Sequence, residues 1–159
     1  MFGARDYARS LEPLLGQAAA YARALLRNRA DAEDAVQQAA LRGLERLATF
    51  DAARPFKGWW FAILRNCCID ILRRRPPTEP LGDRDPPAPK SGEGPDWVRF
   101  DDAIERLPPL HSEILRLRYF GELRYADLAE ALRIPQGTVM SRLHLARKAL
   151  AALLKEEAP

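Results

Sequence analysis

The chain has 159 residues, of which 47% are apolar and 30% are charged, and its formal net charge is +3. This balance is typical of a globular protein and excludes an intrinsically disordered chain. No apolar run approaches the length of about twenty residues that a membrane span needs, and the N-terminus has no secretory signal. We therefore expect a cytoplasmic protein without membrane insertion, in which the adjacent Cys67 and Cys68 fill core space.

Three helices are predicted in the first half of the chain. Apolar spacing indicates a helix over about 7–27, a second over 31–50 and a third over 56–75. Pro13 and Gly16 are unfavourable in the early part of the first helix. The second begins at Asp31, which is expected to cap it. The third stops at Pro76, because proline cannot continue a helix.

The predicted third helix has two distinct faces. Trp60 belongs to an apolar stripe that is expected to be buried, whereas Trp59, Asn66 and Arg73 follow one another at seven-residue spacing on another face. A tryptophan, an amide and an arginine in line suit a nucleic-acid strand with exposed bases. For Trp59 alone, packing against a neighbouring helix is the better interpretation, and Asn66 could bond locally with Asp70. For the arginines that end the helix, the structural and the nucleic-acid interpretations are even.

Proline and glycine are concentrated in residues 76–95, which hold seven of the thirteen prolines and three of the nine glycines. This composition excludes a helix interior or a central strand and indicates an extended linker. No segment alternates as a strand would. We therefore expect an all-α protein of two small domains, residues 1–75 and 96–159, joined by the proline-rich linker.

Four further helices are predicted over about 96–107, 109–120, 125–132 and 136–153. The third of these is short, and a turn at Pro135 separates it from the last. Two helices joined in this way are typical of a helix-turn-helix, whose second helix enters the major groove of DNA.

The last predicted helix has a buried stripe beneath a basic surface. No acidic residue lies between Glu130 and Glu156, although five basic residues do. A step of 100° per residue from the stripe gives the outward positions. The candidates for base edges are Met140, Ser141, His144 and Leu145, and those for phosphates are Arg142, Arg147 and Lys148. The alternative is an ordinary amphipathic helix with a solvated basic face.

No motif for catalysis or metal binding is present. The chain has no phosphate-binding glycine loop and no clustered metal ligands, and its two histidines, His111 and His144, stand far apart. Asp101 and Asp102 look like acidic partners for the start of their helix. We therefore expect no enzymatic activity, no cofactor and no metal.

Three segments together resemble the extracytoplasmic-function (ECF) group of bacterial sigma factors. They are DAEDAVQQAALRGLERLATF, PFKGWWFAILRNCCIDILRRR and the stretch from LPPLHSE to LARKAL. The most specific feature is Gly137-Thr138-Val139 followed by Ser141-Arg142-Leu143 after a proline turn. The N-x-x-x-D-x-x-R pattern of the third helix is the next most specific. The resemblance covers nearly everything except the two ends and the linker.

The resemblance implies two DNA-binding domains that dock on core RNA polymerase, and it makes an anti-sigma protein a further expected partner. The second helix would bind the polymerase through Asp34, Gln37, Gln38, Leu41 and Leu44. The last helix would read the upstream promoter element in duplex DNA through Thr138, Met140, Ser141, Arg142, His144, Leu145, Arg147 and Lys148. The third helix and the loop before it would capture the locally melted downstream element through Phe50, Arg54, Phe56, Lys57, Trp59, Asn66, Arg73 and Arg74.

The positions of Met140 and Leu145 are often basic in this family, so the upstream sequence preference cannot be carried over. Apolar side chains can instead read thymine methyl groups. Leu145→Ala is therefore expected to weaken promoter discrimination, and Arg147→Ala to weaken binding to any sequence. Two alternatives remain: a stand-alone helix-turn-helix regulator, and a sigma-mimicking adaptor that sequesters an anti-sigma protein. The adaptor is disfavoured because it should have lost its basic DNA faces.

Overall fold

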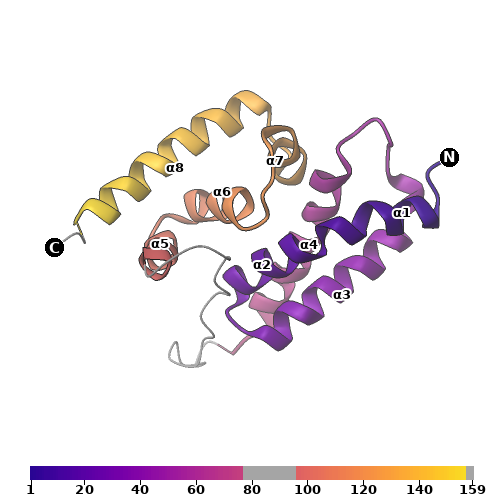
Figure 1. Cartoon of the computed structure of the whole chain (residues 1–159), viewed down its shortest axis with the longest axis horizontal. Coiled ribbons are helices and arrows are strands. Elements are labelled where there is room, and N and C mark those ends of the chain that lie inside the picture. Colours follow the sequence, from indigo (N-terminus) through magenta and orange to yellow (C-terminus); the bar gives the residue numbers. More distant parts are fainter. Residues whose placement is uncertain (77–95, 157–159) are drawn as a thin grey trace.

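The computed structural model describes residues 1–76 and 96–156, and every regular element in these residues is a helix. The all-α prediction is therefore confirmed. The predicted linker falls almost wholly on residues 77–95, which lie outside the described residues. The helices form an N-terminal module, α1 to α4, and a C-terminal module, α5 to α8 (Figure 1).

Four α-helices and two 3₁₀ turns make up the N-terminal module. They are α1 (Ala4–Leu11), η1 (Glu12–Leu14), α2 (Leu15–Leu26), α3 (Arg29–Glu45), η2 (Leu47–Thr49) and α4 (Phe56–Arg74). The single helix predicted over 7–27 is thus wrong, because a 3₁₀ turn containing Pro13 interrupts it. The predicted end of the second helix near Phe50 is also wrong, since α3 ends at Glu45 and a separate 3₁₀ turn follows.

The start of α3 is capped by a different residue from the one predicted. The side chain of Asn28 accepts a hydrogen bond from the backbone N–H of Asp31 at 2.9 Å, which satisfies one free donor of the first turn. Asp31 lies inside the helix and accepts a hydrogen bond from Arg75 at 2.9 Å. Arg75 also donates to the carbonyl of Leu26 at 2.7 Å, so it fastens the end of α4 to the turn between α2 and α3.

Trp60 forms the centre of the N-terminal core. Its side chain is fully buried, and its indole N–H donates to the hydroxyl of Tyr7 at 3.0 Å. The Tyr7 hydroxyl donates in turn to the carbonyl of Ala40 at 2.7 Å. This relay joins α1, α3 and α4 and satisfies both buried polar groups.

The C-terminal module consists of α5 (Asp96–Glu105), α6 (Pro109–Tyr119), α7 (Tyr125–Leu132) and α8 (Gln136–Glu156). Arg133 ends α7 in the left-handed region at φ 54°, which turns the chain sharply into α8. The predicted helix-turn-helix is therefore formed by α7 and α8. Leu110, in the first turn of α6, is 56% exposed.

The two modules pack directly against each other, with α7 on α4 and α6 on α2 (Figure 1). Gly58 allows the first of these contacts. A β-carbon at this position would lie 2.6 Å from the carbonyl oxygen of Asp127 and 2.7 Å from the β-carbon of Glu130. The buried residues of both modules consequently form one continuous core, which the sequence did not predict.

Candidate nucleic-acid interface

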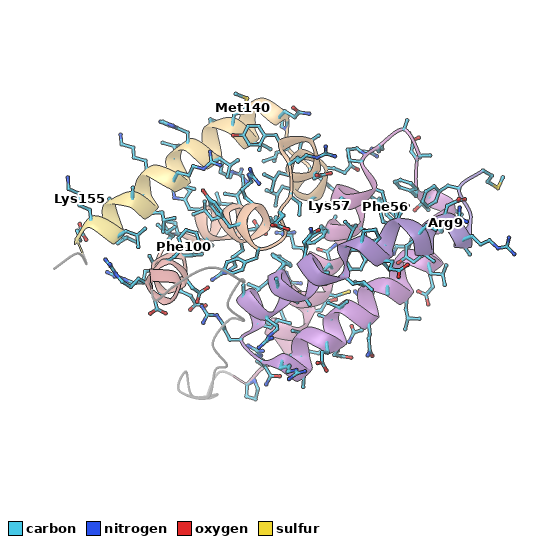
Figure 2. The ribbon with its side chains drawn as sticks, viewed as in Figure 1. Arg9, Phe56, Lys57, Phe100, Met140 and Lys155 are labelled. Carbon is cyan, nitrogen blue, oxygen red and sulfur yellow. The ribbon has the colours of Figure 1, made fainter. Side chains whose placement is uncertain are left out.

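The outward face of α8 is exposed as the helical spacing predicted. Met140 is 57% exposed and Leu145 is 54% exposed, while Val139 and Leu143 on the opposite side are completely buried. Ser141, His144 and Lys148 are exposed beside the two apolar side chains. Met140 points away from the rest of the molecule at the start of the helix (Figure 2). Exposed apolar groups within a basic, acid-free surface can contact thymine methyls while their neighbours reach phosphates.

Arg147 lies at the edge of the buried side of α8 and is held by a neighbouring helix. Its Nε donates to the hydroxyl of Tyr119 at 3.2 Å, and its side chain is half-buried. Hydrogen bonds to the hydroxyls of Tyr119 and Tyr125 raise the pKa of Arg147 above its ordinary value. The guanidinium therefore braces α8 against α6 and α7. Thr138 and Arg142 are also half-buried, at the edge of the exposed face.

The predicted downstream-element residues Phe50, Phe56 and Trp59 belong to one aromatic cluster. The ring centroids of Phe50 and Trp59 are 4.8 Å apart, and those of Phe56 and Trp59 are 5.7 Å apart. Phe2 completes the cluster at 5.0 Å from Phe50, although nothing in its sequence context indicated this. Trp59 thus packs within its own module, which is the structural interpretation favoured for it alone.

Arg54 and Lys57 make their contacts with the C-terminal module. Arg54 forms an ion pair with Glu130 of α7 at 3.2 Å, and Lys57 donates to the backbone carbonyl of Glu122 at 2.9 Å. Lys57 points into the junction between the modules (Figure 2). Partial burial there lowers the pKa of Lys57. Lys57 is therefore half-buried at the junction, whereas the side chain of Arg54 remains 61% exposed despite its ion pair.

A hollow of about 840 Å³ lies beside these contacts, between the loop before α4 and the helix-turn-helix. Arg54 and Trp59 line it on one side, and Glu130 and Arg133 line it on the other. Two residues of the predicted downstream set therefore face the helix-turn-helix across this hollow, whereas no residue of the predicted upstream set lines it.

Asn66, Arg73 and Arg74 remain exposed on α4. The local bond considered between Asn66 and Asp70 is not the one found, since Asp70 accepts from Arg42 of α3 at 3.2 Å. Asn66 is consequently free to meet a ligand. Arg73 and Arg74 form a small basic end to the helix, whereas the third arginine of the cluster, Arg75, is used structurally.

The predicted polymerase-binding residues form an exposed strip along α3. Leu41 is 63% exposed and Leu44 is 46% exposed, so neither is buried within the module. Asp34 and Gln37 are exposed on the preceding turns. Gln38 is half-buried and donates to the carboxylate of Asp34 at 2.7 Å. Two leucines open to solvent beside polar side chains can receive the surface of a helical partner.

A buried ion cluster, which no local sequence pattern indicated, joins the modules at another point. Arg27, at the left-handed end of α2, pairs with Asp101 of α5, and both are nearly completely buried. Glu105 lies 3.8 Å from Arg27 and 3.4 Å from Arg116. The role expected for Asp101 at a helix start is wrong, because it occupies the sixth position of α5 and neutralises a buried arginine.

No group of side chains suited to hold a metal ion occurs among the residues with described positions. Within the same residues, no helix has both the length and the apolar character that crossing a bilayer requires.

Comparisons with known proteins match both modules. The family model described as Sigma-70 region 2 matches residues 11–76, and that described as Sigma-70, region 4 matches residues 97–150. The ECF RNA polymerase sigma factor SigL of Mycobacterium tuberculosis is 33% identical over 144 residues, covering 86% of this chain and 81% of the relative. The ECF RNA polymerase sigma factor SigW of Bacillus subtilis is 30% identical over 154 residues, covering 83% and 80%.

Two solved structures share the arrangement of helices. The sigma factor RpoE of Bartonella quintana, in complex with the anti-sigma factor NepR, has a TM-score of 0.75 and 26% identity, covering 98% of this chain and all of that one. The structure of CnrH in complex with the cytosolic domain of CnrY has a TM-score of 0.74 and 23% identity, covering 97% of this chain and 90% of that one. The second likeness concerns the fold alone.

Proposed function

This chain belongs to the ECF RNA polymerase sigma factors, and from that premise we propose how its two modules divide the work of initiation. As an alternative sigma factor it binds core RNA polymerase and directs transcription from specific promoters. The N-terminal module holds the polymerase and the downstream element, and the C-terminal module holds the upstream element. The module boundaries at residues 1–75 and 96–159, and the residue roles below, are part of this proposal.

The polymerase contact is assigned to the strip on α3. Exposed Leu41 and Leu44 supply apolar area, and Asp34, Gln37 and Gln38 supply the polar rim. The exposure of these two leucines in a module whose other large apolar residues are mostly buried is the observation that carries the proposal, because a partner is needed to cover them.

Upstream recognition is assigned to α8. Met140 and Leu145 read apolar base edges, Ser141 and His144 offer hydrogen bonds, and Lys148 meets a phosphate. Arg142 and Thr138 flank this face. Arg147 contributes by fixing α8 against Tyr119, so its effect on DNA is indirect.

Downstream capture is assigned to α4 and the loop before it. The aromatic cluster of Phe50, Phe56 and Trp59 provides surfaces on which an unstacked base can lie, and stacking is worth about 1–3 kcal/mol per base. Asn66 offers hydrogen bonds, and the exposed cations Arg73 and Arg74 attract the strand. Arg54 and Lys57 join this set once they are released from the C-terminal module.

The protein acts in the cytoplasm and catalyses no reaction itself, since the polymerase supplies the active site. An anti-sigma protein is the expected regulator, as it is for the sigma factor solved with NepR. Such a partner would have access to both modules, because their junction lies at the surface around the hollow lined by Arg54 and Glu130.

Transcription with purified components tests the proposal. Core RNA polymerase is mixed with the protein and a library of genomic fragments, and new transcripts are mapped. We expect defined start sites that depend on the added chain, and co-purification of the chain with the core enzyme. Binding to duplex DNA without any association with polymerase would instead support a stand-alone regulator.

A matched pair of variants tests the surface on α3. Leu41→Asp should abolish co-purification with polymerase and leave the fold intact, because its side chain is solvent-exposed. Leu15→Asp provides the control, since Leu15 is an exposed leucine on α2. Equal loss of polymerase binding in both variants would contradict the assignment to α3.

A further inference from the structure

We propose that Phe2 is a positioning residue for capture of the downstream promoter element. Phe2 lies before α1, whereas every residue to which the proposed function gives a promoter contact lies at or beyond Phe50. By holding both ends of the loop that precedes α4, Phe2 fixes the aromatic surface that receives an unstacked base. The inference rests on the proposed function, because it adds a residue to the same DNA-binding surface.

Phe2 contacts this loop at its beginning and at its end. Its ring centroid lies 5.0 Å from that of Phe50, in an edge-on arrangement, and 5.8 Å from that of Phe56. Phe50 follows η2 and Phe56 is the first residue of α4, so the loop over 51–55 runs between the two contacts. The residues before α1 and this loop lie at the same end of the molecule (Figure 1). Phe50 and Phe56 also contact each other at 5.5 Å, so the three rings close the loop.

Backbone hydrogen bonds beside Phe2 fix its place. The N–H of Gly3 donates to the carboxylate of Asp6 at 2.8 Å, and the carbonyl of Gly3 accepts from the N–H of Tyr7 at 2.9 Å. These bonds complete the first turn of α1. Tyr7 is nearly buried in the core, and its ring lies edge-on to Phe56 with the centroids 5.8 Å apart. Phe2 is thus attached to a helix that is itself fixed to the module.

The middle of the loop is held by local bonds. Residues 51–54 are exposed. The carbonyl of Asp51 accepts from the N–H of Arg54 at 2.9 Å, and the carboxylate of Asp51 accepts from the N–H of Ala53 at 3.0 Å. These bonds shape a turn, but they do not set its direction relative to α4. The ion pair of Arg54 with Glu130 joins the loop to the other module. Within its own module, the loop therefore depends on the aromatic residues at its two ends.

Trp59 depends on the same rings. It lies 4.8 Å from Phe50 and 5.7 Å from Phe56 between ring centroids, and it borders the hollow beside the loop. Phe2 supports the two phenylalanines that Trp59 contacts. Without the ring of Phe2, each phenylalanine loses a neighbour, and the freedom that it gains must be removed again when a base binds. Phe2 therefore contributes to base capture by ordering the surface in advance.

Binding of the holoenzyme to two DNA probes tests this role. Core polymerase is assembled with the unmodified chain or a variant, and both probes come from a promoter mapped in the transcription experiment. One probe is a duplex with the upstream element alone, and the other adds the downstream element in a short mismatched bubble. Phe2→Ala should weaken binding to the bubbled probe about tenfold, through the lost aromatic contacts, and leave the upstream duplex unchanged. Phe2→Tyr should bind both probes as the unmodified chain does, because it keeps the ring.

Asn28→Ala is the control for stability. Asn28 caps α3 and takes no part in the ring contacts, so its replacement should destabilise the module without changing the binding of either probe. Thermal unfolding measures the stability of each variant. If Asn28→Ala and Phe2→Ala lose equal affinity for the bubbled probe, lower stability alone explains the loss and the inference is overturned.

Abasic sites in the bubble give a readout that stability alone does not move. Each unpaired base of the downstream element is removed in turn, and the largest loss of affinity identifies the base that stacks on the aromatic surface. In Phe2→Ala the same removal should cost much less, because the surface is no longer ordered. Additive losses from the variant and the abasic site would contradict a positioning role.

The two probes also separate this inference from the proposed function. If the unmodified holoenzyme binds the bubbled probe no better than the upstream duplex, the proposed downstream capture fails, and the role of Phe2 fails with it. If the bubble strengthens binding and Phe2→Ala keeps the whole gain, only the role of Phe2 is overturned.

Discussion

Asp101 illustrates how a single residue can join two modules. Its carboxylate and the Arg27 guanidinium are both nearly completely removed from water, so each charge depends on the other. An intact buried ion pair adds little net stability. Removing one partner nevertheless destabilises the protein strongly, because a buried charge is left uncompensated.

Asp101→Ala should therefore destabilise the protein by about 3 kcal/mol. Its neighbour Asp102 is exposed on the same helix, so Asp102→Ala should change stability by less than about 0.5 kcal/mol. Urea unfolding followed by circular dichroism measures both values. Similar midpoints for the two variants would show that Glu105 alone can neutralise Arg27.

The adjacent thiols should be inert in the folded protein. Burial is the main cause that raises the pKa of Cys68 to about 12, and it raises the pKa of Cys67 as well. The thiolate is the reactive form, so a thiol reagent at about pH 8 should label neither cysteine until urea is added. Rapid labelling of the native protein would contradict the buried positions of both.

The same shift links stability to pH. Because the folded state favours the protonated Cys68 thiol, this contribution is complete below the ordinary value of 9.0 and is lost as the pH rises toward 12. The free energy of unfolding should thus fall over that range, and Cys68→Ala should reduce the slope. If the slope is unchanged, the loss of stability at alkaline pH comes from other groups. One such group is the fully buried Tyr21, whose pKa is also raised by burial.

At the scale of single elements, the recognition helix and its supports are separable. Leu145 is exposed on α8, whereas Arg147 is bonded to Tyr119. The first should affect which sequence is bound, and the second should affect how firmly the helix is held.

Leu145→Ala should reduce the preference for cognate over scrambled upstream duplex, with about 1 kcal/mol lost on the cognate site. Lys148→Ala should weaken both duplexes equally and reduce the salt dependence of binding. Fluorescence anisotropy at several salt concentrations measures both effects. Equal losses on the two duplexes for Leu145→Ala would contradict a base-reading role.

The cap of α3 gives a further test at this scale. Asn28→Ala should cost about 1 kcal/mol by removing the acceptor for the Asp31 N–H, whereas Asn28→Ser should retain most of the stability. The difference in melting temperature between the two variants measures the contribution of the cap hydrogen bond. Identical values for the two variants would mean that the cap bond contributes nothing measurable.

The sequence predicted these elements where the signal lies within one helix, and it failed where a break or a cap had to be chosen between similar residues. The 3.6-residue period located α4, α7 and α8 well, because apolar spacing within a helix is a local property. The break at η1 was not placed: Pro13 is unfavourable inside a helix, but the apolar spacing continues through it. The capping role of Asn28 was missed because Asp31 is an equally good cap by residue type.

At the scale of the whole molecule, some predicted site residues are exposed and others are held at the contact between the modules. Sequence reasoning could not foresee this division. The outward face of α8 and the exposed strip on α3 follow from helical periodicity. The pairing of Arg54 with Glu130 and the close contact at Gly58 do not, because they depend on how two distant segments meet. A glycine in a helix carries no local sign that another helix will lie against it.

The continuous core should make the two modules unfold together. Calorimetry of the unmodified chain should show one transition, with equal calorimetric and van't Hoff enthalpies. Gly58→Leu should lower the transition temperature and broaden the transition, because it removes the contact of α7 with α4 and leaves those of α2 with α5 and α6 to couple the modules. Two transitions in the unmodified chain would indicate that the shared core contributes little to cooperativity.

Trp59 and Trp60 are neighbours in sequence that have contrasting surroundings. Trp60 is sealed inside the N-terminal core, while Trp59 borders the hollow at the junction. An indole in a dry interior emits at shorter wavelength than one near water, so once the third tryptophan, Trp97, is replaced by phenylalanine, the emission of Trp59 can be compared with that of Trp60 in the same chain. Emission from Trp59 should shift to the red when α7 departs and be quenched when a nucleobase stacks on it, which would report successive stages of initiation without any attached dye.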